Sequence, residues 1–270
     1  MYKISIITVC LNSVKTIRDA IESLLQQTYQ NFEYIIVDGE SVDGTLDIIK
    51  EYECIFGNRM KLISERDHGI YDAMNKGIEI ASGDIIGILN SDDWYENYTL
   101  ERIKKEFDAD ENLEIITGEL RFVSFEKKHV KIWRNRNIPK TILYKMPVNH
   151  PATFVKRSVY EEIGNFDLRY KMSSDYDFIC RAYVCHKNFK QINEILVNMR
   201  LGGATSRLRN RTSQDFKNAF ILIKEDYLLI KRNMKKNLII RYWARFIKLY
   251  LCQTIYQLID NLTFLKKAKL

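Results

Sequence analysis

Apolar residues follow two alternating patterns in the first hundred positions of the chain. Short, almost wholly apolar runs predict buried strands at 4–10, 33–37, 60–64 and 85–89. Between these runs, apolar residues at helical spacing predict helices after residue 13, from residue 46 and over 70–81. Strands that alternate with helices are typical of right-handed βαβ units. The pattern therefore predicts an α/β fold whose central sheet is mostly parallel.

The pattern changes in the second half of the chain. Further strands are expected at 113–118, 120–123 and 130–133, and a helix at 176–185. From residue 214 onward the sequence is helical in character. In that tail, Ile239, Trp243, Phe246 and Tyr250 fall on one helical face, with Arg241, Arg245, Lys248 and Cys252 on the opposite face.

Charge divides the chain at about residue 206. Residues 207–270 carry fifteen Lys and Arg against four Asp and Glu, a net charge of +11, whereas residues 1–206 carry −4. We therefore expect a catalytic or binding domain at 1–206 and a helical, basic amphipathic extension at 207–270. Such an extension is typical of binding to an anionic membrane surface. Packing on the domain itself or on a second copy of the chain, in a homodimer, is the alternative.

The remaining composition restricts the class of protein. A hydrophobic fraction of 46% with 29% charged residues is typical of a soluble globular protein. Five scattered cysteines without a Cys-x-x-Cys pair argue against a disulfide framework or a zinc site, and favour a reducing cytoplasm. The longest uncharged run of the tail, 249–259, is too short for a membrane span of about 20 residues. No recognised motif for binding nucleic acid accompanies the positive charge.

Two adjacent carboxylates, Asp92 and Asp93, follow the apolar run 85–89. Ligands of open α/β sheets bind at the carboxyl ends of the strands, which is where these side chains lie. Like charges repel, so a divalent cation that also holds phosphate groups is a natural partner for them. The alternative is a solvated acidic turn before the next helix. The chain has neither a G-x-G-x-x-G sequence nor a Walker A sequence, so side chains and a metal would have to hold a nucleotide.

Other carboxylates stand at comparable positions. Asp38 ends the second predicted strand, where it could accept hydrogen bonds from a base or a ribose, or cap the following turn. Asp67 precedes Gly69, which permits close approach of the backbone. Asp72 and Lys76 are four residues apart, so a helical ion pair explains them equally well.

Four motifs in register resemble the nucleotide-sugar half of a family 2 glycosyltransferase with the GT-A fold, of the type that builds bacterial surface polysaccharides. The resemblance covers about the first 200 residues. The motifs are Ser5-Ile6-Ile7-Thr8-Val9; Ile36-Val37-Asp38-Gly39-x-Ser41-x-Asp43-Gly44-Thr45; Asp67-x-Gly69-Ile70-Tyr71-Asp72-Ala73-Met74-Asn75-Lys76-Gly77; and Gly83-Asp84-Ile85-x-x-x-Leu89-Asn90-Ser91-Asp92-Asp93.

The resemblance implies roles for individual residues. It places Thr8, Val9 and Asp38 beside the base, Asp67 and Lys76 near the ribose and diphosphate, Asp92 near the ribose, and Asn12 and Ser91 within the donor site. Asp93, as the last residue of the acidic element, would bind Mn²⁺ or Mg²⁺. Ser91 stands at the first position of that element, where the family has a carboxylate.

The resemblance also implies a general base. The usual Glu-Asp pair of the family appears as Ser174-Asp175, which makes Asp175 the expected base and Asp177 the second choice. Asp175 could also cap its helix. His150 is expected near the active site or as a structural hydrogen-bonding residue. Arg200 or Arg207 could contact the diphosphate from a loop at 199–206, which could equally be a simple linker.

Together these features predict an inverting, metal-dependent transferase that moves one sugar from a UDP-sugar to a lipid-linked or oligosaccharide acceptor at the inner face of the cell membrane. Single transfer is expected because the Gln-x-x-Arg-Trp element and the membrane spans of processive synthases are missing. A sugar nucleotidyltransferase is one alternative, although residues 10–16 lack its glycine-rich loop. A non-catalytic sugar-nucleotide or membrane-binding module is the other.

Overall fold

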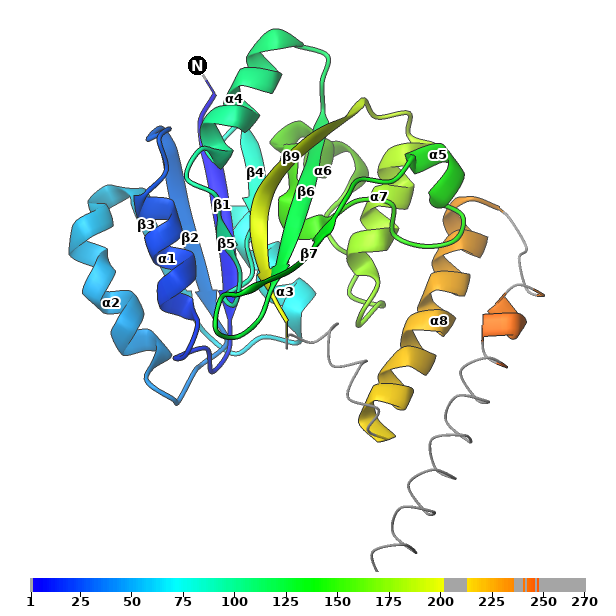
Figure 1. Ribbon diagram of the computed structural model, residues 1–270, viewed down its shortest axis with the longest axis horizontal. Helices are drawn as coiled ribbons and strands as arrows, with labels where there is room; N and C mark the ends of the chain where they lie inside the picture. The colour runs from blue at the N-terminus through cyan, green and yellow to red at the C-terminus, as the bar shows by residue number, and fades with distance from the viewer. Residues whose placement is uncertain (1, 202–212, 236–239, 241, 246, 248–270) are drawn as a thin grey trace, which may run out of the picture. The chain divides into compact units, whose positions relative to one another are not determined.

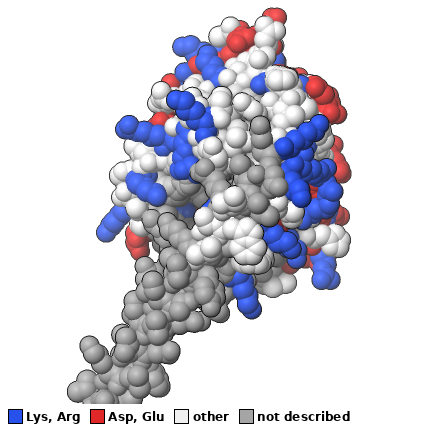
Figure 2. Space-filling model, turned by 90° about the vertical axis from the view of Figure 1, so that its right-hand side faces the viewer, with Lys and Arg blue, Asp and Glu red and all other residues white. Residues whose placement is uncertain are grey.

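The computed structural model describes residues 2–201, 213–235, 240, 242–245 and 247. The chain separates into two compact units, Met1–Leu201 and Gly202–Leu270. The expected boundary at 206/207 falls among residues that the structure does not describe. Figure 2 shows Lys and Arg side chains at several places on the described part of the face that it draws.

The first unit is built on one mixed sheet (Figure 1), with the strand order β3-β2-β1-β4-β8-β6-β9-β5 and with β7 paired to β6. The strands are β1 (Ile4–Cys10), β2 (Phe32–Asp38), β3 (Met60–Ser64), β4 (Ile85–Ile88), β5 (Trp94–Tyr95), β6 (Ile115–Val123), β7 (His129–Trp133), β8 (Thr153–Lys156) and β9 (Phe189–Arg200). The ladders among β3, β2, β1 and β4 are all parallel. β8 enters antiparallel between β4 and β6, while β6 and β9 are again parallel.

Helices alternate with the strands along the chain and cover the sheet. In the first unit they are α1 (Ile17–Leu25), α2 (Thr45–Phe56), α3 (Ile70–Ile80), α4 (Thr99–Ala109), α5 (Ile138–Thr141), α6 (Arg157–Ile163) and α7 (Ser174–Val184), with short 3₁₀ turns η1 (Gly57–Arg59) and η2 (His150–Ala152). α3 packs very closely on β1, because a Cβ atom at Gly77 would lie 2.4 Å from the side chain of Ile7. Glycine at this helical position is thus a packing requirement.

The expected α/β fold is confirmed. The strands expected at 4–10 and 60–64 have the observed bounds of β1 and β3, and the expected helix at 70–81 is α3. Two details differ. The expected strands at 113–118 and 120–123 are one continuous strand, β6, and the expected loop at 199–206 begins inside β9. β9 was not predicted, because its polar and apolar residues alternate only in part.

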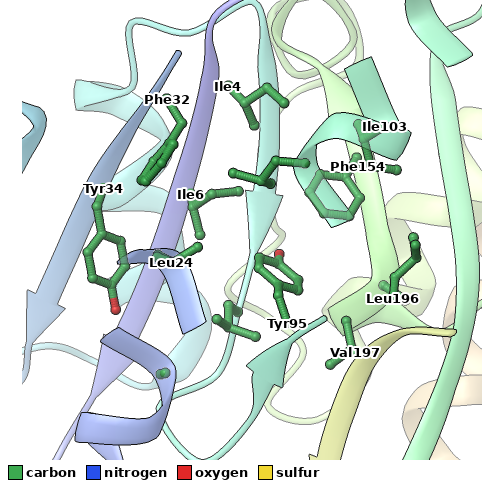
Figure 3. Packing of buried hydrophobic residues seen from close by; sticks show 14 of the residues in the cluster. Ile4, Ile6, Leu24, Phe32, Tyr34, Tyr95, Ile103, Phe154, Leu196 and Val197 are labelled. Carbon is green, nitrogen blue, oxygen red and sulfur yellow. The ribbon is translucent and has the colours of Figure 1, made fainter. Parts of the chain in front are cut away.

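The sheet curls so that its last strand returns to the middle of the structure. β5 lies at the far end of the strand order from β4, yet only the five residues 89–93 connect them, and these form a turn with a hydrogen bond from Asp93 N to Asn90 O (3.1 Å). As a result Tyr95 of β5 packs on Phe154 of β8, with ring centroids 5.6 Å apart (Figure 3). β4 and β5 therefore share one core.

A buried carboxylate, Glu33, ties the start of the first two strands together. It is 2% exposed and accepts hydrogen bonds from Ser5 Oγ (2.6 Å), Ser82 N (2.6 Å) and Ser82 Oγ (2.8 Å), while Lys3 and Lys61 lie at 3.0 and 3.1 Å. Burial alone would raise the pKa of Glu33, but these hydrogen bonds outweigh it and hold the pKa well below the ordinary value.

The second unit contains α8 (Ser213–Asn233). Within it, Arg245 pairs with Asp226 at 3.1 Å, and the rings of Tyr227 and Tyr242 lie 5.5 Å apart. Of the residues expected to form the amphipathic tail helix, Ile239, Phe246, Tyr250, Arg241, Lys248 and Cys252 lie outside the described residues. No helix in the described part of the chain is long and apolar enough to cross a membrane.

We predict that Glu33→Gln lowers the free energy of unfolding at pH 7 by about 2 kcal/mol, because hydrogen bonds to an ionised group are lost. The folded pKa of Glu33 lies below its unfolded value, so its stabilisation is present above the unfolded pKa and is lost as the pH falls through the folded value. Urea denaturation of both proteins at several pH values checks this. The gap between them should narrow below about pH 4. Glu53→Gln, at an exposed position, is the control, and an equal effect there would contradict the prediction.

Candidate functional site

Three loops meet at the carboxyl edge of the parallel strands and are cross-linked by hydrogen bonds. They follow β1, β2 and β4. The loop after β1 reaches the loop after β2 through Asn12, whose Oδ1 accepts from Val42 N at 3.0 Å and whose N donates to Ser41 Oγ at 2.8 Å. It reaches the loop after β4 through the hydroxyl groups of Ser13 and Ser91, which lie 2.8 Å apart. The predicted donor-site residues Asn12 and Ser91 thus hold this edge together.

The Asp43-Gly44-Thr45 motif fixes the loop after β2 through hydrogen bonds. Asp43 accepts from Thr45 Oγ1 at 2.5 Å and from Val14 N at 3.1 Å, while Thr45 Oγ1 accepts from Ser13 N at 2.8 Å. Gly44 has φ = 95°, a left-handed conformation that favours glycine. The motif therefore fixes the β1 loop as well as the start of α2.

Asp38 and Asp67 lie on either side of Gly39. Asp38 is fully buried, and its Oδ2 accepts from Ser41 N (3.0 Å) and Ser64 Oγ (2.9 Å), which is the turn-capping arrangement. Asp67 packs against the backbone after β2, because a Cβ atom at Gly39 would lie 2.5 Å from its Oδ2. The structure thus brings two of the predicted donor-site carboxylates to one place.

The strand residues expected beside a base are inside the core. Thr8 and Val9 are 0% and 6% exposed, so neither presents its side chain to a ligand at the surface. Leu11, immediately after β1, is 55% exposed, and its Cδ1 lies 3.5 Å from the position of a Cβ at Gly39. Leu11 therefore exposes an apolar side chain at the end of β1, whereas Thr8 and Val9 do not.

Lys76 supports the loop that carries Asp67. Its ammonium donates to Arg66 O (2.9 Å) and pairs with Glu65 (2.8 Å), with Asp72 at 3.5 Å. These contacts raise the pKa of Lys76, the hydrogen bond to Glu65 being the largest cause. The ammonium thus remains charged beside the predicted ribose and diphosphate position.

Asp92 and Asp93 occupy very different environments. Asp93 is 1% exposed, and its two oxygens accept from Arg200 N and Asn90 Nδ2, both at 3.0 Å. Burial, followed by the Asp92 charge, raises the pKa of Asp93 well above the ordinary value. Asp92 is only partly buried. The predicted metal ligand Asp93 is therefore enclosed, whereas its neighbour Asp92 is not.

Arg200 is a structural clamp and does not face the predicted diphosphate position. The residue is 4% exposed, with its guanidinium donating to Asp92 O (3.2 Å), Phe125 O (3.0 Å) and Asp19 Oδ2 (2.5 Å). The expectation that it contacts a diphosphate from a loop does not fit these contacts. Arg207, the other candidate, lies outside the described residues. Asp19, which completes the clamp, carried no signal in the sequence.

A second group of predicted residues meets beside α3. Tyr71 OH donates to Asp175 Oδ1 at 2.9 Å, which joins α3 to the start of α7. Burial, followed by the Asp175 charge, raises the pKa of Tyr71 well above its ordinary value, so the hydroxyl remains a donor. Burial also lowers the pKa of His150, although Asp175 opposes this shift, so His150 is mainly neutral at pH 7. The sequence motif contained Tyr71, but no role was predicted for it.

Asp175 and its alternative, Asp177, face different environments. Asp175 is partly buried, and its Oδ1 accepts from the main-chain N–H of Tyr176 (2.9 Å) as well as from Tyr71. Asp177 is fully buried and pairs with Arg181 Nε at 2.8 Å, while the same guanidinium donates to Asn165 O at 2.7 Å. Asp177 thus stabilises the α7 region, whereas the two hydrogen bonds to Asp175 both use its Oδ1 atom.

Comparison with known proteins agrees with these features. The sequence model of "Glycosyl transferase family 2" matches residues 5–164. A "PGL/p-HBAD biosynthesis glycosyltransferase" of Mycobacterium bovis is 32% identical over 182 residues, which are 66% of this chain and 69% of that protein. The "Chondroitin synthase" of Pasteurella multocida is 28% identical over 82% of this chain but only 23% of its own length.

Solved structures show the same fold at low identity. TarS of S. aureus in complex with UDP-GlcNAc superposes with a TM-score of 0.66 at 18% identity, over 87% of this chain and 68% of that chain. The mannosyltransferase PcManGT of Pyrobaculum calidifontis, in complex with GDP-Man and Mn²⁺, gives a TM-score of 0.61 at 19% identity, over 86% of this chain and 71% of that chain.

We predict that Arg200→Lys lowers the free energy of unfolding by about 2 kcal/mol, because lysine cannot reproduce the forked contacts to Asp92, Phe125 and Asp19. Urea denaturation measures this loss. Unchanged stability together with weakened nucleotide binding would instead identify Arg200 as a diphosphate contact.

Proposed function

Because the chain belongs to glycosyltransferase family 2, we propose that it moves one sugar, with inversion, from a UDP-sugar to the hydroxyl group of a glycan in cell-surface polysaccharide biosynthesis. The observation that carries this proposal is the meeting, around α3, of the loop bearing Asp67 with the hydrogen-bonded pair Tyr71–Asp175. The proposed donor-binding edge and the candidate base thus both adjoin the start of α3.

Transfer of the sugar needs a base that takes the hydroxyl proton and a group that stabilises the negative charge on the leaving diphosphate. The acceptor oxygen bonds to the anomeric carbon while the bond from that carbon to the diphosphate oxygen breaks, and the electron pair leaves with the nucleoside diphosphate. We assign Asp175 to take the hydroxyl proton on Oδ2, while Tyr71 holds Oδ1. Neutral His150 beside it does not compete as a cation for the carboxylate.

The residues present fit a divalent cation. Mg²⁺ and Mn²⁺ sites for nucleotides use one or two carboxylates together with substrate phosphates. Asp92, partly buried in a turn at the strand ends, supplies such a carboxylate. The described residues contain no cluster of three metal-ligating side chains, so substrate phosphates would have to complete the coordination. A bound cation would neutralise charge on the leaving diphosphate. The GDP-Man and Mn²⁺ complex of PcManGT supports this assignment by analogy.

The donor and acceptor classes rest on related proteins and on the sequence. The UDP-GlcNAc complex of TarS supports a uridine nucleotide, with Leu11 and Asp67 as the base and ribose side and with the buried Asp38 capping the neighbouring turn. A lipid-linked acceptor at the cytoplasmic face of the membrane is the proposal that suits the basic tail at 207–270. A dimer formed through that tail is the competing assignment. Neither alternative function, nucleotidyltransferase or non-catalytic module, has a comparable observation in its favour.

Thermal-shift titration with UDP, dTDP and GDP, each with and without Mn²⁺, tests the donor site. We expect UDP to raise the melting temperature only when Mn²⁺ is present, since a ligand that binds the native state stabilises it. Asp92→Asn should abolish this shift. Asp93→Asn should mainly lower the melting temperature of the free protein. A metal-dependent shift that survives in Asp92→Asn but not in Asp93→Asn would restore Asp93 as the ligand.

Asp175→Asn should lower kcat by about 10²- to 10⁴-fold, the usual contribution of a general base. Its dissociation constant for UDP should change by less than about twofold, since the base does not bind the nucleotide. Asp177→Asn is the comparison, because it should destabilise the fold through Arg181 and lose less activity per folded molecule. Single-turnover kinetics and isothermal titration calorimetry measure the two quantities. Full activity in Asp175→Asn would remove the proposed mechanism.

A further inference from the structure

A cavity of about 530 Å³ opens between β5, β9 and the β6–β7 hairpin, among residues to which no role has been assigned. Its lining includes Trp94, Glu96, Arg121, Lys127, His129 and Asn198. The volume lies within the range of about 300–1,000 Å³ that is usual for ligand sites. The cavity therefore has the size and the polar lining of a binding site.

The floor of the cavity is a fixed polar network. Arg121 Nη1 donates to Glu96 Oε1 (2.7 Å) and to Asn198 Oδ1 (2.8 Å), and Asn198 Nδ2 donates to Glu96 Oε1 (2.9 Å). Asn198 is 4% exposed, so this network is built into the fold. Among the described residues, Arg121 has no other side-chain partner, which leaves further N–H groups of its planar fork for a ligand.

One wall is aromatic and carries positive charge. The guanidinium of Arg200, which is buried, lies 5.0 Å from the ring centroid of Trp94, and Lys127 Nζ lies 5.4 Å from it. Lys127 has φ = 60°, in a tight turn where its N donates to Ser124 O at 3.0 Å, and its ammonium pairs with Asp19 at 2.6 Å. A non-glycine residue is uncommon in this conformation, which often marks a functional position.

The hairpin that contributes Lys127 and His129 to the cavity carries a charge opposite to that of the domain as a whole. Residues 125–136 of the hairpin contain five Lys and Arg, one His and a single Glu, whereas residues 1–206 carry a net charge of −4. Figure 1 shows the loop between β6 and β7 extending toward α1, as the Lys127–Asp19 contact requires. An anionic ligand would therefore be attracted to this hairpin against the general charge of the domain.

We propose that this cavity is a second saccharide-binding site, for a glycan segment that carries carboxylate or phosphate groups. The indole ring of Trp94 can pack against the apolar face of a pyranose, while the amide of Asn198 and the guanidinium of Arg121 can bind hydroxyl and acidic groups. A recess accommodates a saccharide chain better than it contacts a flat membrane surface. Because Arg200 contacts both Trp94 and the Asp92 carbonyl, the site adjoins the donor turn. The interpretation of this glycan as the acceptor rests on the proposed transferase function. The binding of a glycan in the cavity does not depend on that function.

Isothermal titration calorimetry of the full chain tests the site with three saccharides of five residues. Galacturonan supplies carboxylates, phosphorylated mannopentaose supplies a phosphate, and maltopentaose is the neutral comparison. We expect at least one acidic saccharide to bind ten or more times more tightly than maltopentaose, and the stronger of the two identifies the acidic group. Raising the salt from 0.05 to 0.5 M should weaken this binding. Equal binding of all three would overturn the acidic specificity.

Matched variants locate the binding. Lys127→Gln with His129→Gln removes two exposed lining groups, and we expect it to weaken acidic saccharide binding at least fivefold. Lys128→Gln removes the same kind of charge from the same turn but not from the lining, and should change binding less than twofold. Circular dichroism verifies that each variant folds. Equal weakening by Lys128→Gln would show diffuse attraction to the hairpin and would overturn the cavity as the site.

Two further measurements distinguish a saccharide site from a membrane contact and from the donor site. Binding only to vesicles of phosphatidylserine, with no saccharide bound, would identify the hairpin as a membrane contact and overturn the proposal. UDP binding in the presence of Mn²⁺ should be the same in the double variant and the unchanged protein. Failure of the unchanged protein to bind UDP, with saccharide binding intact, would refute the proposed transferase and leave the saccharide site standing.

Discussion

The buried contact between Asp93 and the main chain of Arg200 is the constraint on which the catalytic unit depends. It joins the turn after β4 to the end of β9, two places that lie about 100 residues apart in sequence. The Arg200 side chain then reaches α1 through Asp19 and the hairpin turn through Phe125 O. Burying a carboxylate is costly unless it is hydrogen-bonded, so this contact fixes one arrangement of the curled sheet.

In two places of this protein, one of two nearby aspartates is enclosed while the other is partly exposed. Asp93 is enclosed while its neighbour Asp92 is partly exposed. Asp177 is enclosed with Arg181, while Asp175 meets Tyr71. In a helix of 3.6 residues per turn, side chains two positions apart point about 200° apart, so Asp175 and Asp177 cannot face the same site. In each pair the contacts of the enclosed residue fix the backbone segment that also carries its partly exposed neighbour.

The curl of the sheet also brings the turn after β4 next to the cavity at the hairpin. β5 follows the donor turn directly, and its Trp94 forms a wall of that cavity. The same guanidinium that supports the turn lies against the indole ring. Arg200 thus links the turn after β4 to the wall of the cavity through two direct contacts.

The sequence alone determined the α/β class, most of the strand and helix positions in the first hundred residues, and the family. It could do so because buried parallel strands are continuous apolar runs and because the motifs Asp43-Gly44-Thr45 and Asp67 to Gly77 have strict local requirements. It also placed Asp38, Asp67, His150 and Asp175 in segments that the fold brings to the strand ends or beside α3.

Which of these side chains are buried follows from the tertiary structure and could not be read from the sequence pattern. Adjacent aspartates look alike in sequence, and burial, which distinguishes Asp92 from Asp93, depends on a strand whose end lies more than a hundred residues away. The same reason explains why Arg200 was expected to face a ligand and is instead a clamp, and why Asp19 and Tyr71 received no role. Periodicity reports local structure, whereas the direction of a charged side chain is set by the long-range contacts that compensate its burial.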